Sequence, residues 1–220
     1  MTRYAIRLLW LALAVQAAWL LVNGLVLHRS PGLDVLGAVI GLSVAGFAAL
    51  YRRPTGAAVL VRVVMAADFL LAVADRFGLL GVPGAQGVFW GNFTHFIDYT
   101  HTVTVFLPRS VAPPLAIMAT IAEITLGLSL LLGIQLRRAA LGSAALLAVY
   151  GICMTLSLPL AQQFHYNVLI LAAAMLALAA RHPATLTVDQ WVTRRSELHW
   201  RTARLSHPAP PAPVTDGRPR

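Results

Sequence analysis

Six apolar segments, each close to the length of a membrane-spanning helix, constrain the fold of this 220-residue chain. About 20 apolar residues cross the hydrocarbon core of a bilayer as an α-helix, and the lower limit is ~17. Because 58% of the residues are hydrophobic and only 11% are charged, the composition excludes a water-soluble domain. The sequence predicts an all-α polytopic transmembrane bundle with six spans, at approximately residues 5–27, 34–51, 57–80, 111–133, 138–159 and 164–180.

The basic residues predict the orientation of this bundle. All 17 are arginines, and only Arg29, Arg76 and Arg109 fall on one of the two sides. Since basic residues near span ends are retained in the cytoplasm, we expect both termini to be cytoplasmic and residues 81–110 to be external. The net charge of +9 then reflects topology, and nucleic acid is not an expected partner. The first segment lacks a clean cleavage site and is expected to remain as a span.

Two carboxylates, Asp68 and Glu123, lie deep inside the third and fourth apolar segments. A carboxylate at membrane depth costs at least ~2.5 kcal/mol and by default indicates a functional site. Counted from opposite sides of the membrane, the two acids should meet near its midplane, and Glu123 shares a helix face with Thr120 and Gly127. The functional interpretation is an acid pair of raised pKa that passes protons or binds a lipophilic carrier. The structural interpretation is a protonated carboxyl that bonds a backbone carbonyl or Tyr150.

Other polar residues are secondary candidates. Asp75 and Arg76 lie near the external end of the third segment, where interfacial charges are expected. The external connection predicts a short amphipathic helix that caps the bundle, with Trp90 as an interface anchor. Its expected apolar side comprises Phe93, Phe96 and Ile97.

Metal and disulfide chemistry are not predicted. His95 and His101 are six residues apart, and with Asp98 and His165 they match no standard metal-site spacing, so no metal site is expected. The single cysteine, Cys153, lies in an apolar run and cannot form an intramolecular disulfide.

Residues from about 57 to 180 resemble the DoxX-like membrane proteins. The resemblance rests on Asp75-Arg76-Phe77-Gly78, on the connection from Asn92 to Pro108, and most specifically on residues 122–128, Ala-Glu-Ile-Thr-Leu-Gly-Leu, with the basic turn Arg137-Arg138 after them. Glu123 takes the position of the acid in that motif. The resemblance implies a four-helix core at residues 55–182, and the two helices of residues 1–54 are additional to it.

The same resemblance implies a bacterial inner-membrane protein associated with a redox assembly, since relatives include a subunit of thiosulfate:quinone oxidoreductase and components of oxidative-stress complexes. Many relatives have no assigned activity, and whether this chain is an enzyme stays open. The leading hypothesis is a quinone-interacting or redox-linked membrane subunit in which Glu123 and Asp68 bind or protonate the carrier. No haem-ligand pair, cysteine cluster or nucleotide loop stands in the sequence, so no intrinsic cofactor is expected. Electrons would have to come from a soluble or membrane redox partner or from a bound cofactor, for which quinone is the candidate. The alternatives are a proton-coupled carrier of a small solute and a non-catalytic scaffold for a soluble partner.

The C-terminal region predicts a separate cytoplasmic element. Residues 183–205 contain a capping-box pattern, Thr187 and Gln190, and form an amphipathic helix suited to the anionic inner leaflet, with docking of a soluble partner as the alternative. Residues 206–220 are Pro-rich and expected to be disordered.

Overall fold

The computed structural model describes residues 2–28, 35–51 and 56–181, and the regular elements of these residues are all helical. The expected cytoplasmic helix and the Pro-rich tail lie outside the described residues. The elements are α1 (Thr2–Leu21), η1 (Val22–Val26), α2 (Val35–Ala49), α3 (Gly56–Arg76), α4 (Phe93–Val103), η2 (Arg109–Val111), α5 (Ala112–Leu132), α6 (Leu136–Ser157), α7 (Ala161–His165) and α8 (Val168–Ala179).

The prediction of an all-helical fold is confirmed for the described residues, whereas the prediction of six spans is not confirmed. Four helical stretches are long and apolar enough to cross a membrane: Thr2–Val26, Gly56–Arg76, Arg109–Leu132 and Leu136–Ser157. The expected second and sixth spans appear as α2 and α8, which are apolar helices of 15 and 12 residues. The sixth segment is shortened because the chain breaks at Asn167, whose φ of 55° lies in the left-handed region.

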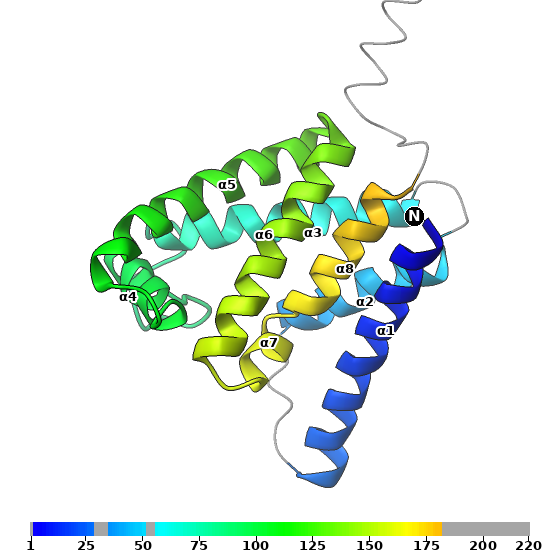
Figure 1. Ribbon diagram of the computed structural model, residues 1–220, viewed down its shortest axis with the longest axis horizontal. Coiled ribbons are helices and arrows are strands. Elements are labelled where there is room, and N and C mark those ends of the chain that lie inside the picture. Colours follow the sequence, from blue (N-terminus) through cyan, green and yellow to red (C-terminus); the bar gives the residue numbers. More distant parts are fainter. Residues whose placement is uncertain (1, 29–34, 52–55, 182–220) are drawn as a thin grey trace, which may run out of the picture.

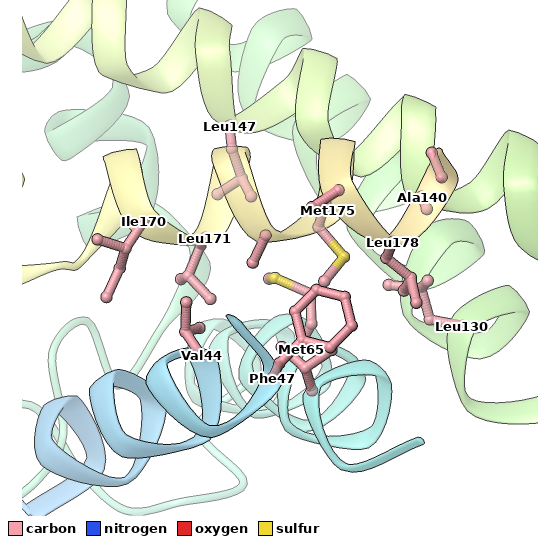
Figure 2. Close-up of a cluster of buried hydrophobic side chains, with 14 of the residues drawn as sticks. Val44, Phe47, Met65, Leu130, Ala140, Leu147, Ile170, Leu171, Met175 and Leu178 are labelled. Carbon is pink, nitrogen blue, oxygen red and sulfur yellow. The ribbon is translucent and has the colours of Figure 1, made fainter. Parts of the chain in front are cut away.

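The helices pack around α8. Figure 1 shows α8 between α6 on one side and α1 and α2 on the other, whereas α3 and α5 run side by side and α4 covers one end of that pair. Figure 2 shows the apolar core that α8 shares with α2, α3, α5 and α6. Its labelled side chains are Val44, Phe47, Met65, Leu130, Ala140, Leu147, Ile170, Leu171, Met175 and Leu178, and all of them are buried.

Three helix ends meet at the end of the molecule opposite α4 (Figure 1). The Thr2 hydroxyl donates to the Ala180 carbonyl at 3.2 Å, and the Tyr51 hydroxyl donates to the Ala177 carbonyl at 3.0 Å. These bonds satisfy carbonyls that the last turn of α8 leaves without helical partners. The ends joined here are those that the arginine pattern assigns to the cytoplasmic side.

The predicted external amphipathic helix corresponds to α4. Asn92 begins it, because its side chain accepts a hydrogen bond from the backbone N–H of His95 at 2.9 Å. The helix contacts α3, α5 and α6 and so covers one end of the bundle, as expected from the sequence. Its position brings aromatic side chains over the end of α3.

Candidate functional site

The register between α3 and α5 determines which polar side chains meet. A Cβ placed on Gly127 of α5 would lie only 3.1 Å from Cγ of Leu70 and 3.4 Å from Cβ of Phe69 on α3. The absence of a side chain therefore lets the two helices approach closely. Because α5 runs antiparallel to α3, residues earlier in α5 face residues later in α3. Thr120, two turns before Gly127, accordingly lies beside Arg76 at the end of α3.

Arg76, Thr120, Glu123 and Tyr150 form one hydrogen-bonded cluster, which we call the Arg76 centre. Nη2 of Arg76 lies 2.8 Å from Oε1 and 2.6 Å from Oε2 of Glu123, and Nη1 donates to Oγ1 of Thr120 at 3.0 Å. The Tyr150 hydroxyl, from α6, donates to Oε1 of Glu123 at 2.5 Å. Three helices, α3, α5 and α6, therefore contribute side chains to one cluster, which consists of an ion pair and two hydroxyl groups.

The ion pair of the Arg76 centre is closed to solvent, whereas Tyr150 is half-buried. Arg76 and Glu123 are each only 2% exposed, and the side chain of Thr120 is also buried. Buried charges of opposite sign compensate each other, which lowers the large desolvation cost that either would carry alone. Within the part of the chain that the structure describes, Nε of Arg76 has no hydrogen-bond partner. The cluster thus retains one buried donor whose bonding capacity is unused.

Aromatic rings cover the face of the Arg76 guanidinium. Its Cζ lies 3.6 Å from the ring centroid of Phe96 and 5.2 Å from that of Trp90. These distances suit cation–π attraction, which strengthens when the cation is removed from water. The Trp90 and Phe96 rings also contact each other edge to face, with their centroids 5.1 Å apart. Trp90 is half-buried, and its ring packs against the Arg76 centre.

Asp75 neighbours Arg76 in sequence but has different partners. Its carboxylate accepts the backbone N–H groups of Phe89 and Trp90 at 2.9 Å each and that of Gly91 at 3.2 Å. Asp75 is 1% exposed. The expectation that Asp75 and Arg76 are interfacial charges is wrong, because the connection after α3 folds back over the helix end and encloses both side chains.

Asp68 is not part of the Arg76 centre. It lies on α3, half-buried, eight residues before Arg76. Since Gly127 packs at the level between Phe69 and Leu70, Glu123 lies opposite a position about 8 Å farther along α3 than Asp68, at ~1.5 Å per residue. The structure therefore pairs Glu123 with Arg76 instead of bringing it beside Asp68. Counting residues from opposite membrane sides placed both acids near the middle, but it could not give the relative shift of the two helices.

Helix α4 adds a second group of aromatic contacts beside the centre. Tyr99 contacts Trp90, with ring centroids 5.8 Å apart, and its pKa is raised by burial and by the neighbouring hydroxyl of Tyr166. Phe93 stacks on Phe77, with centroids 5.9 Å apart. The aromatic residues that the sequence pattern assigned to the apolar side of this helix therefore face the bundle.

Potential metal ligands do not gather in the described ranges, where no group of three or more His, Cys, Asp and Glu residues could hold a metal ion. Asp98 pairs instead with Arg109 at 3.0 Å, and both side chains are exposed. The thiol of Cys153 is free.

Comparisons of this chain with models of protein families, with curated proteins and with solved structures found no match. The resemblance to DoxX-like proteins therefore depends on the sequence motifs themselves, in which Arg76 and Glu123 both stand. These two residues are also the ion pair of the buried centre.

Proposed function

We propose that this chain is a DoxX-like protein of the bacterial inner membrane whose Arg76 centre binds the polar head of a quinone. In this proposal α2 and α8 complete a six-span bundle, both termini are cytoplasmic, and a soluble or membrane redox partner supplies electrons. The buried Nε–H of Arg76 carries the proposal. A buried donor without an acceptor costs about 1–3 kcal/mol, and a ligand oxygen at that position would remove the cost.

The chemistry around Arg76 suits such a ligand. A quinone head is a flat ring with carbonyl oxygens that accept hydrogen bonds, and its isoprenoid tail requires an apolar route. Phe96 and Trp90 provide aromatic surface beside the free Nε–H of Arg76. Mostly apolar surroundings with a few fixed polar groups are typical of small-molecule sites.

Glu123 and Tyr150 supply a route for a proton. The Tyr150 hydroxyl is 2.5 Å from Glu123, a distance typical of a strong bond between a hydroxyl and a carboxylate. We propose that these groups exchange a proton with bound quinone, whose reduction consumes protons as well as electrons. Asp68 lies outside the cluster and has no direct role in this proposal. Of the two acids that the sequence led us to expect as a pair, the proposed site therefore uses Glu123 alone.

The deciding experiment compares Tyr150→Phe with the wild-type protein in nanodiscs loaded with ubiquinone. This substitution removes one hydroxyl and leaves the Arg76–Glu123 ion pair in place. We expect quinone affinity to fall by about tenfold, the value of one hydrogen bond to a charged group. Retained quinone is quantified by mass spectrometry, and the dissociation constant is obtained by titration with a short-chain quinone.

Two control variants sharpen this comparison. Thr125→Val alters an exposed hydroxyl of α5 that donates only to the Ile121 carbonyl, and Asp68→Asn alters the acid outside the cluster. Both should retain quinone at the wild-type level. Equal quinone retention by wild type and Tyr150→Phe, or none by wild type, would reject the proposal and favour the solute-carrier or scaffold hypothesis.

A further inference from the structure

We propose that Asp75 is a positioning residue that latches the turn 89–91 over the Arg76 centre and so holds Trp90 against the Arg76 guanidinium. Three consecutive backbone N–H groups converge on this one carboxylate, at 2.9, 2.9 and 3.2 Å. Such a concave run of N–H groups is a general anion-binding arrangement, and here the anion is a side chain of the same protein. The contact between Asp75 and the turn does not depend on a ligand. Only its effect on quinone binding at the Arg76 centre rests on the proposed function.

The backbone around the latch is tightly fitted. Gly91 has a φ of 67°, and a Cβ added to it would lie 2.5 Å from the backbone N of Pro83. Gly78, with a φ of 71°, passes so close to Gly91 that a Cβ on it would lie 2.9 Å from the Gly91 carbonyl oxygen. Glycine is required at both positions, since other residues rarely adopt this conformation and a side chain would collide. The 78–91 connection therefore closes on itself beside the end of α3.

The latch is mechanically linked to the site because the residue that it holds, Trp90, is one of the two whose rings cover the cation. The N–H of Trp90 bonds Asp75, while the indole ring of Trp90 lies 5.2 Å from Cζ of Arg76. Asp75 and Arg76 are adjacent on α3, so the helix end carries both the anchor of the turn and the group that the turn covers. Loss of the anchor should release Trp90 without removing any atom from the Arg76–Glu123 pair.

The test uses the ligand-free full-length protein in nanodiscs and the substitution Asp75→Asn. Asparagine has the same shape, but it directs an NH₂ group at the backbone donors and cannot accept all three bonds. We expect amide hydrogen exchange at residues 89–91 to accelerate by about tenfold or more. In a variant that keeps Trp90 as its only tryptophan, we expect acrylamide to quench the fluorescence more strongly after the same substitution.

Matched variants make each outcome decisive. Gly91→Ala disturbs the same turn without changing the acid and should produce both effects, which keeps the test open if Asp75→Asn does not fold. Asp98→Asn removes an exposed acid and should produce neither effect. Unchanged exchange in a folded Asp75→Asn variant would overturn the latch whatever Gly91→Ala does, and faster exchange with unchanged quenching would overturn its positioning of Trp90. These readouts require no quinone, so they are independent of whether the Arg76 centre binds one.

Discussion

Two parts of the molecule bury polar side chains for different reasons. Where α1, α2, α7 and α8 meet, neutral amides bond to backbone carbonyls: Gln16 donates to Phe164 at 2.9 Å and Asn167 donates to Gly37 at 3.4 Å. The helices are irregular there, with a π-helical turn after α1 and a break before α8. Each of these bonds ties two elements together across the irregular region, Gln16 of α1 to the carbonyl of Phe164 in α7 and Asn167 at the start of α8 to the carbonyl of Gly37 in α2. A structural requirement is therefore sufficient to explain the neutral amides.

The Arg76 centre differs because its charged groups do not repair the backbone. Arg76 and Glu123 bond each other and the hydroxyls of Thr120 and Tyr150. A buried ion pair is weak evidence for stability, since apolar residues of similar volume often replace it without loss. The proposed function assigns the charges in this region a task other than folding, and the predictions below test that difference.

The largest effect is expected from breaking the ion pair on one side only. Glu123→Gln should destabilise the protein by about 3–5 kcal/mol because it leaves the Arg76 charge buried without compensation. The double variant Arg76→Met with Glu123→Met should regain most of that stability while losing quinone binding. Unfolding in mixed micelles measures the first quantity and nanodisc titration the second. If the double variant were as unstable as Glu123→Gln, the ion pair would be required for folding. The Arg76 centre would then not differ in this respect from the region of the buried amides.

A smaller effect is expected at two threonines of α5 that differ in one contact. Both hydroxyls donate to the carbonyl four residues earlier, at 2.8 Å, but only Thr120 also accepts a bond from Arg76. Thr120→Val should cost about 1.5–3 kcal/mol, as for other hydrogen bonds to charged groups, whereas Thr125→Val should cost less than about 0.5 kcal/mol. Unfolding free energies of the two variants provide the measurement. Equal costs would mean that the bond from Arg76 contributes little.

In the amide region, Asn167 should show a backbone effect instead of an electrostatic one. Its φ of 55° is costly for alanine, by about 1–2 kcal/mol, but not for glycine. Asn167→Ala should therefore destabilise the protein more than Asn167→Gly, although both lose the bond to the Gly37 carbonyl. Thermal unfolding of the two variants provides the comparison. Equal destabilisation by the two variants would show that the lost side-chain bond dominates and that the left-handed backbone at Asn167 contributes little.

Sequence patterns predicted the helices and their buried faces better than the contacts between them. The amphipathic helix at the external connection and the shared face of Thr120, Glu123 and Gly127 follow from helical periodicity, and the structure has both. The partner of Glu123 could not be predicted in this way. It depends on how far α3 and α5 slide past each other, which is fixed by close packing at Gly127 against Leu70.

The burial of Asp75 and Arg76 was missed for a related reason. Position near a helix end correctly indicates access to the interface when the following connection leads away from the helix. Here Gly78 and Gly91 let the connection return over the helix end, a path set by left-handed backbone angles and not by hydrophobic periodicity. A search for a cation to compensate Glu123 would have identified Arg76, because a buried carboxylate in a bundle requires a partner.

The smallest expected effect appears only in alkaline solution, at Tyr99 beside the aromatic cover. Burial and the hydroxyl of Tyr166 raise the pKa of Tyr99, so the folded protein holds this proton more tightly than the unfolded chain. The resulting stability is fully present below about pH 10, the ordinary value for tyrosine, and declines as the pH rises above it, by at most about 1.4 kcal/mol per pH unit. The chain has no lysine but has five tyrosines that titrate in this range, so the contribution of Tyr99 is measured as the difference between the wild-type protein and a variant without its hydroxyl. Tyr99→Phe should flatten the alkaline decline in melting temperature, whereas the same change at Tyr4, whose side chain is 71% exposed, should leave it unchanged. An identical decline in both variants would place the alkaline sensitivity elsewhere and separate Tyr99 from the packing that covers the Arg76 centre.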